Sequence, residues 1–410
     1  MNTPDTVGGR AVLTLAHVAG MVDMVALPLW IGVLMQYYRF SAPQAGGTVS
    51  LFLLAVVLVS SVLAPHFSRL PHRLLASSGF LVAAVAFFLA SYQHGSAEQF
   101  GGLIVLHGLA GAGIGCALSM THGAIGRNGN PHRLFAMVSM AMGVSAVLFL
   151  SLMPPLIARL GAQVLFQAFA LLMTLAAVTT ALFFPAIEPR SVSAPSASIK
   201  VRLPRPTWPV IGVVICLTMN QSMVFAFLER LGHFRGFSSD QINGVLISLG
   251  LVNLLPGLLA ALLQKRWSAN WVGMLGPVIQ AVLAMIMVQT VLFGPYALTS
   301  SLYVAVVIFT HTFLFGLLTR LDPSGAAASA TPAMTMIGSC IGPLLGGVVV
   351  AGIGYQGLGW AACLIALVAV LLMRQVQLTR PVNCVGVIEY DAISTVPAAV
   401  ADGEAITPGR

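Results

Sequence analysis

Long apolar runs, twelve of them, constrain this chain more than any other feature. A helix that crosses a bilayer needs about 20 mostly apolar residues, because no water is there to bond its backbone groups. The runs lie at about 11–35, 45–64, 74–93, 100–122, 134–156, 163–184, 208–230, 241–263, 271–291, 297–319, 333–353 and 357–374. Only 7% of residues are charged, whereas soluble proteins carry about 25%. The sequence therefore predicts an all-α membrane protein, and its helices are called spans 1 to 12 below.

The runs divide into two sets of six. Between them, residues 185–207 are rich in Pro and Ser, carry four basic residues and have no apolar face. This predicts an N-terminal six-helix bundle at 1–184, a cytoplasmic linker at 185–207 and a C-terminal six-helix bundle at 208–374. The polar segment 375–410 is expected to be a disordered cytoplasmic tail. Two six-helix repeats favour a substrate site between the halves.

The basic residues give the expected orientation in the membrane. If the N-terminus is cytoplasmic, 15 of the 19 Lys and Arg fall on the cytoplasmic side. The other four are Arg39, Arg159, Arg230 and Arg235. This bias predicts a multi-pass protein with both termini in the cytoplasm, and the composition suggests a bacterial inner membrane. It also explains the net charge of +8 without a nucleic-acid partner.

The loop between spans 2 and 3 resembles the signature loop of the major facilitator superfamily. That loop has a Gly, three residues, an acid, Arg, any residue, a second Gly and then basic residues. Arg69 and Arg73 match, whereas Ala64, Ser68 and Pro71 replace the Gly, the acid and the second Gly. The resemblance covers about residues 10–375 and implies the major facilitator fold, in two pseudo-symmetric halves, and a monomer. Physically, the two arginines are suited to binding helix C-terminal carbonyls or lipid phosphates, or to setting orientation alone.

A second family motif lies on span 11. Its residues are Gly338, Gly342, Pro343, Gly346 and Gly347, in the order Gly-x-x-x-Gly-Pro-x-x-Gly-Gly. In many exporters of the family this motif lies on span 5. Glycines permit close helix contact and the proline permits a kink, so a hinge and simple tight packing are both open.

The ionisable residues inside the predicted spans form the third feature. They lie on spans 1, 4, 7 and 10, which line the central cavity in the family: His17, Asp23, His107, Glu229 and His311, with His122 at the inner end of span 4. A charge in the middle of a bilayer costs about 2.5–3.5 kcal/mol, so such residues persist where they face water, a partner or a substrate. In the family an Arg on span 4 is associated with proton coupling, and His107 takes that place here.

Asp23 is the sharpest of these candidates, because it lies near the middle of span 1. It is expected to bind a proton or a cationic substrate group, with a structural hydrogen bond as the alternative. His107 and His311 are expected to face each other across the halves, or else to be packing residues. Asn220 and Gln221 on span 7 suit a polar ligand, or a helix-to-helix hydrogen bond. Glu229 and Arg230 are expected to form an interfacial ion pair or outer gate.

These features predict a secondary active transporter that moves a small organic molecule by alternating access. Proton coupling is expected, with efflux slightly favoured over the alternative, proton-coupled uptake of a weak organic acid or neutral metabolite. No Lys or Arg lies deep in a span, which disfavours a strongly anionic substrate. No enzyme, nucleotide-binding or metal-binding motif is present, so no cofactor is expected. A membrane sensor without flux is the alternative from another class. The expected partners are the substrate, protons and membrane lipids.

Overall fold

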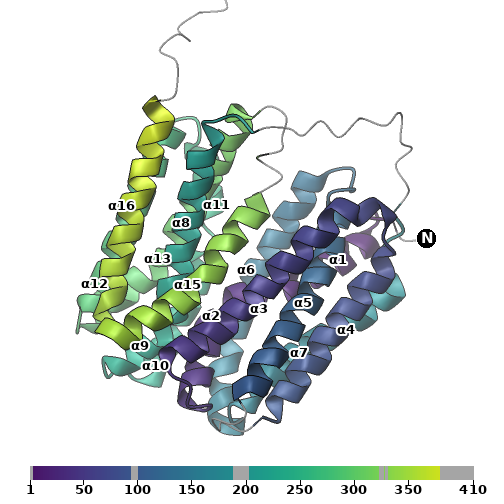
Figure 1. Cartoon of the computed structure of the whole chain (residues 1–410), viewed down its shortest axis with the longest axis horizontal. Helices are drawn as coiled ribbons and strands as arrows, with labels where there is room; N and C mark the ends of the chain where they lie inside the picture. Colours follow the sequence, from purple (N-terminus) through teal and green to yellow (C-terminus); the bar gives the residue numbers. More distant parts are fainter. Residues whose placement is uncertain (1–2, 94–99, 188–202, 323–326, 328–330, 379–410) are drawn as a thin grey trace, which may run out of the picture.

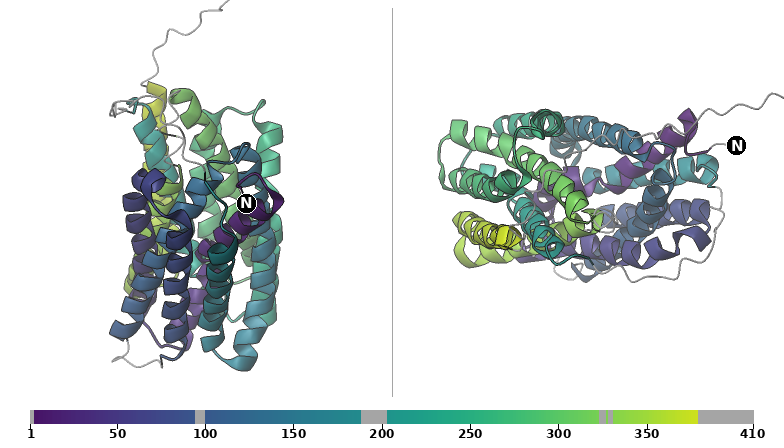
Figure 2. Two further views of the ribbon diagram at one scale, coloured as in Figure 1. Left: turned by 90° about the vertical axis from the view of Figure 1, so that its right-hand side faces the viewer. Right: turned by 90° about the horizontal axis from the view of Figure 1, so that it is seen from above.

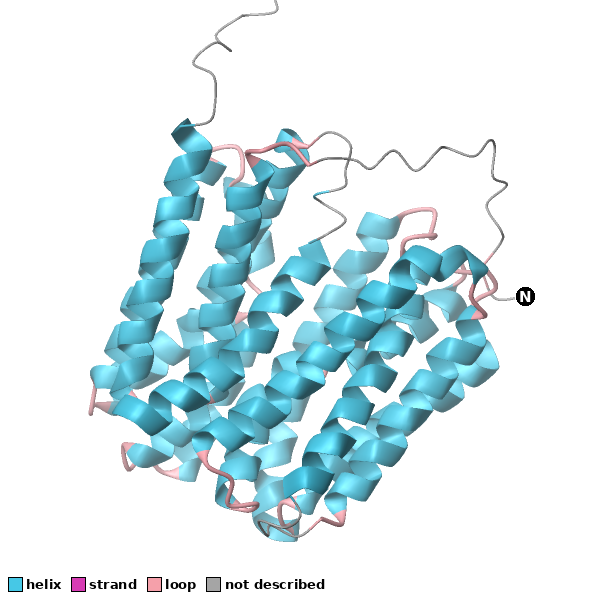
Figure 3. Ribbon diagram, viewed as in Figure 1, coloured by secondary structure: helices cyan, strands magenta, loops and turns pink. Residues whose placement is uncertain are grey.

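The computed structural model describes residues 3–93, 100–187, 203–322, 327 and 331–378, and contains twelve helices able to cross a membrane (Figures 1 and 3). Single helices form spans 3 to 6, 9, 11 and 12: α4 (His72–Ser91), α5 (Phe100–Ile125), α6 (Pro131–Leu160), α7 (Gln163–Phe183), α12 (Ala269–Gln289), α15 (Thr331–Ile353) and α16 (Gln356–Leu378). Span 10 is α13 (Phe293–Leu321), and span 2 is α3 (Ala42–Leu63) followed by a 3₁₀ turn η1 (Ala64–Arg69). The predicted number of spans is confirmed.

Three spans differ from the continuous helices that the sequence predicts. Span 1 is broken into α1 (Val7–Gly20) and α2 (Asp23–Gln36). Span 7 is α8 (Thr207–Ala226), which continues as the short α9 (Leu228–Phe234). Span 8 is broken into α10 (Ser239–Val252) and α11 (Pro256–Leu263), where Pro256 cannot continue the backbone bonding. Most of the predicted linker, residues 188–202, and of the predicted tail, residues 379–410, lies outside the described residues.

Close helix contact at glycines holds each half together. A methyl group added at Gly79 of α4 would overlap the carbonyl oxygen of Gly113 on α5. Gly111, on the same helix, lies equally close to the carbonyl oxygen of Phe52 on α3. These contacts agree with the expectation that glycine in the spans permits close packing. Figures 1 and 2 show spans 1–6 on one side of the molecule and spans 7–12 on the other.

The two ends of the bundle are distinct. At one end, called the linker face, α1 begins, α7 ends, α8 begins and α16 ends (the upper end in Figure 1). The contacts between the halves given below, all among described residues, lie away from this face. Near the opposite face, the Leu344 backbone N–H of α15 donates to Ser50 Oγ of α3, at 3.0 Å. Gly46 of α3 lies against the Pro343 carbonyl, and Gly347 of α15 against the Ala42 carbonyl.

Two further contacts between the halves show the same distribution. Mid-membrane, Gly250 and Leu254 of span 8 lie against Val147 and Gly143 of α6. The linker-side part of α6 is different. Phe135 and Met137, two positions apart and so on opposite sides of this helix, are 40% and 42% exposed. Only one side of α6 can face lipid, so the other side borders an open space between the halves. The molecule is therefore closed at the face opposite the linker.

Candidate transport site

The break in span 1 lies at Met21 and Val22, and Asp23 begins the second helix segment. The Met24 N–H donates to the Met21 carbonyl, three residues back, so the regular bond to the Gly20 carbonyl is not made. Glycine is a weak helix former and aspartate favours helix N-termini, which explains a break between Gly20 and Asp23. Gly20 and Asp23 were thus a sequence signal for the break, although the length of the apolar run predicted one continuous helix.

The Asp23 carboxyl lies inside the protein at this break and is 4% exposed. It lies beside the backbone N–H groups of Asp23 and Met24. Its Oδ2 atom is buried and has no hydrogen-bond partner among the described residues. An ionised carboxylate held there without a cation would be strongly unfavourable. A carboxyl in this position is therefore suited to carrying a proton.

His17 of α1 and His122 of α5 form a hydrogen-bonded pair. The distance from His17 Nδ1 to His122 Nε2 is 2.9 Å, and both side chains are partly exposed. One nitrogen must donate and the other accept, so the two rings hold a shared proton between spans 1 and 4. His17 lies six positions before Asp23 along span 1, towards the linker face. The sequence placed both histidines on cavity-lining spans but could not show that they touch.

His107 lies in the core of the first half and is fully buried. Its Nε2 accepts a 3.1 Å hydrogen bond from the Trp30 indole N–H, and its Nδ1 donates to the Leu103 carbonyl at 2.7 Å. The rings of Phe87 and Phe166 pack around it. The expectation that His107 faces His311 across the halves is therefore wrong. Both nitrogens are satisfied within the first half, as in the alternative interpretation of a packing residue.

His311 on α13 is the second residue of that expected pair. Its ring is partly exposed and stacks on Phe315, with ring centroids 5.5 Å apart. Its Nε2 atom has no hydrogen-bond partner in the part of the chain that the structure describes. Unlike His107, it can still offer a nitrogen to a ligand.

The neighbouring amides Asn220 and Gln221 on α8 have different surroundings. Asn220 is 1% exposed, and its amide donates to the Ala362 carbonyl at 3.4 Å. The Tyr303 hydroxyl donates to the backbone carbonyl of Asn220 at 2.9 Å and also accepts from the Gln280 side-chain amide at 3.5 Å. Asn220 thus joins helices of the second half, and sequence reasoning missed Tyr303 and Gln280. Gln221 is partly exposed, and within the described residues its amide makes no hydrogen bond.

Glu229 and Arg230 lie on α9, near the closed face, where they contact span 1. Glu229 pairs with His233 at 3.1 Å, and a methyl group at Gly32 would overlap its carboxylate. Arg230 donates to the Gln36 side chain at 3.3 Å. The expected ion pair between Glu229 and Arg230 is therefore replaced by separate contacts of each residue. Both residues thus contact span 1 across the two halves, and their role as an outer gate stays a prediction.

The glycine motif of α15 contacts helices of both halves. Gly338, Gly342 and Gly346 lie against span 7 of their own half, where added methyl groups would overlap Thr218, Ser222 and Phe227. Pro343 and Gly347 lie against α3 of the first half. Tight packing is therefore present along the motif, and its role as a hinge stays a prediction.

The arginines of the loop between spans 2 and 3 have different environments. Arg73 donates to the carbonyls of Ala181 and Leu182, at 3.2 Å for Leu182, near the end of α7. This confirms the expectation that such an arginine binds carbonyls at a helix C-terminus. Arg69 is exposed.

Comparisons with known proteins agree with this architecture. A model of the Major Facilitator Superfamily matches residues 12–332. The crystal structure of a mutant of the nucleoside transporter NupG has the same fold, with a TM-score of 0.72 and 13% sequence identity. The match covers 90% of this chain and 99% of that one. No curated protein sequence matches the chain.

Proposed function

Because the chain belongs to the major facilitator superfamily, we propose that it is a proton-coupled secondary transporter in which Asp23 carries the coupling proton. The family and the fold make the protein a multi-pass membrane protein and a secondary transporter. The observation that carries the proposal is the buried Asp23 carboxyl with its unpartnered oxygen. The carboxyl is neutral in this arrangement and loses its proton when rearrangement of the halves exposes it to water.

The break in span 1 supports this role for Asp23. At the break, the backbone can change direction at a lower cost than within a continuous helix, since the regular bond from Met24 to Gly20 is already absent. Span 1 touches the second half at Gly32 and Gln36, through Glu229 and Arg230. Opening of the closed face would separate these residues and move α2, whose first residue is Asp23. Movement of the halves and exposure of the carboxyl are thereby linked.

The distribution of basic residues supports a cytoplasmic linker face. On that orientation, the closed face is the outer one and the structure is inward-facing. The His17–His122 pair then lies between Asp23 and the cytoplasm, where it is placed to pass the proton.

A small, polar, uncharged or weakly charged organic molecule fits the available groups best. Gln221 and His311 retain hydrogen-bonding atoms that no described residue uses. We favour efflux, on the glycine-proline motif that is shared with many exporters. The second candidate is proton-coupled uptake of a weak acid or neutral metabolite. Nucleosides are also tested, because the nucleoside transporter NupG has the same fold.

The test starts with purified protein and a panel of nucleosides, sugars, weak acids, amines and antibiotics. A compound that binds the folded state stabilises it by about 2.7 kcal/mol at a hundredfold excess over Kd, which thermal unfolding detects. Each hit is then assayed in proteoliposomes with a pH gradient of either sign, which gives the direction of transport. Binding without flux in any condition would favour the sensor.

The Asp23→Asn variant tests the coupling role. It should still exchange labelled for unlabelled substrate, while gradient-driven accumulation falls to the level of passive equilibration. Asp5→Asn is the matched control, because Asp5 is exposed near the linker face and its amide can still accept from the Gly129 N–H. Full gradient-driven accumulation by Asp23→Asn would refute the proposal.

A further inference from the structure

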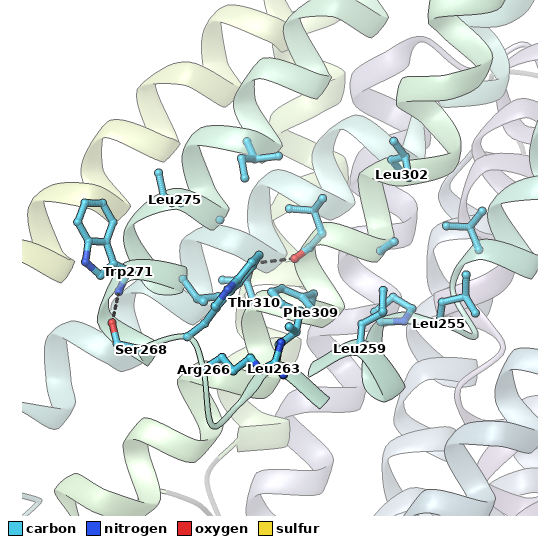
Figure 4. Close-up of a pocket in the computed structure, with 18 residues that line it drawn as sticks. Leu255, Leu259, Leu263, Arg266, Ser268, Trp271, Leu275, Leu302, Phe309 and Thr310 are labelled. Carbon is cyan, nitrogen blue, oxygen red and sulfur yellow. Dashed lines mark hydrogen bonds between the residues drawn. The ribbon is translucent and has the colours of Figure 1, made fainter. Parts of the chain in front are cut away.

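An apolar groove lies on the outside of the second half. Its walls are the broken span 8, α12 and α13, and its volume is about 680 Å³. Figure 4 shows Leu259 of α11, Leu275 of α12 and Phe309 of α13 around it. Leu259 and Leu275 are each 47% exposed, so the groove opens towards the surrounding membrane. An exposed apolar surface of this kind in a membrane protein is covered by acyl chains.

One end of the groove is polar and aromatic. Arg266 and Ser268, from the turn between spans 8 and 9, lie at this end, and Leu302 lies at the other (Figure 4). Trp267 and Trp271 line the same end and are 53% and 66% exposed. Tryptophan favours the boundary between the hydrocarbon and the headgroups. The turn thus marks the level of the lipid phosphates at the linker face.

We propose that this groove is a specific binding site for an anionic phospholipid. The acyl chain fills the groove between α11, α12 and α13, and the phosphate lies against Arg266 and the adjacent, exposed Lys265. Charge decides the occupant, since two neighbouring cations border an otherwise apolar lining and attract an anionic headgroup more than a zwitterionic one. An apolar substrate entering from the membrane would need no such cations.

The break in span 8 explains why the groove exists. Val252, Leu255 and Pro256, at the break, belong to its lining. On the other side of the same break, Leu254 packs on Gly143 of the first half. A bound acyl chain therefore contacts a segment that also joins the two halves, and it supports the arrangement that is closed opposite the linker. This inference does not depend on proton coupling.

Quenching of tryptophan fluorescence by brominated lipid tests the site in the full-length protein. The protein is reconstituted in phosphatidylcholine with a small fraction of either brominated phosphatidylglycerol or brominated phosphatidylcholine. Phosphatidylglycerol should quench more at equal fraction. The excess should vanish in Trp267→Phe/Trp271→Phe and persist in Trp208→Phe/Trp360→Phe, which removes two equally exposed tryptophans from α8 and α16.

Two further variants separate the headgroup from the chain. Lys265→Gln/Arg266→Gln should lower the preference for phosphatidylglycerol about 30-fold, as expected for two basic side chains at a membrane surface. Arg69→Gln/Arg374→Gln removes the same charge from exposed sites on other helices and should leave the preference intact. Ala305→Phe should fill the groove and reduce quenching by both lipids. Equal quenching by the two lipids in the wild type, or a preference that survives Lys265→Gln/Arg266→Gln, would overturn the proposal.

Discussion

The hydrogen bond between Trp30 and His107 provides a quantitative test of whether His107 is a packing residue. Both side chains are fully buried, and the bond joins span 1 to span 4 at 3.1 Å. Trp30→Phe leaves the His107 Nε2 atom without a donor, and His107→Leu leaves the indole N–H without an acceptor. A buried polar group left unpaired costs about 1–3 kcal/mol. The double variant Trp30→Phe/His107→Leu has neither the indole N–H nor the imidazole nitrogen, so no unpaired polar atom of this bond remains buried.

The double-mutant cycle isolates that bond from the loss of packing volume. Coupling energies between polar side chains in membrane helices average about 0.6 kcal/mol and reach about 1.7 kcal/mol. Because both partners are fully buried, we expect a value above this average, about 1 kcal/mol. This corresponds to a factor of about five in the folded-to-unfolded ratio.

The measurement is reversible unfolding of the four proteins in mixed micelles with increasing SDS, followed by far-UV circular dichroism. The sum of the single-mutant losses should exceed the double-mutant loss by the coupling energy. A difference below about 0.3 kcal/mol, which is within the error of additivity, would refute the hydrogen-bonded packing role. His107→Leu should also retain gradient-driven transport, and loss of coupling with exchange intact would assign His107 to the proton pathway.

Three further predictions concern the packing between helices. Gly347→Leu should overlap the Ala42 carbonyl of the opposite half, separate the halves at the closed face and raise thiol labelling of a cysteine introduced there at least tenfold. Arg73→Gln removes the two bonds to the end of α7 and should lower the unfolding free energy in SDS by about 0.5–1.5 kcal/mol, whereas Arg69→Gln should change it by less than about 0.5 kcal/mol. Tyr303→Phe, which removes a fully buried hydroxyl between three helices, should lower the same free energy by about 1 kcal/mol with ligand binding unchanged.

The number of spans could be predicted because it rests on composition over windows of 20 residues. The cost of unpaired backbone groups in lipid leaves helices as the only solution for each run. The break in span 1 depends instead on a few local bonds around Met21 and Val22, which hydropathy does not register. Gly20 was a weak signal for it, since the same residue type elsewhere in this chain, as at Gly79, serves close packing within unbroken helices.

Contacts between distant spans were beyond the sequence. The pair His17–His122 and the partners of Asn220 depend on helix rotation, and a rotation of about 100° per residue decides which neighbour a side chain meets. Arg73 was an exception, because it lies at a helix end, where carbonyls without partners are always near. Helix C-terminal carbonyls were therefore one of the three roles that the sequence left open for it, although the sequence did not indicate that the helix would be α7.

Spans 1, 4, 7 and 10, which line the cavity in the family, also have a face towards the core of their own half. This limits the inference from ionisable residues to function. Both halves place a buried polar contact between their first and fourth spans: Trp30 with His107 in one, and Asn220 with Tyr303 in the other. A polar residue on spans 1, 4, 7 or 10 can therefore be retained for helix packing as readily as for transport. What distinguishes the two uses is whether hydrogen-bonding atoms remain without a partner. By that criterion Asp23, Gln221 and His311 remain candidates for the transport site, whereas the hydrogen bonds of His107 and Asn220 favour a packing role, which the variants above test for His107.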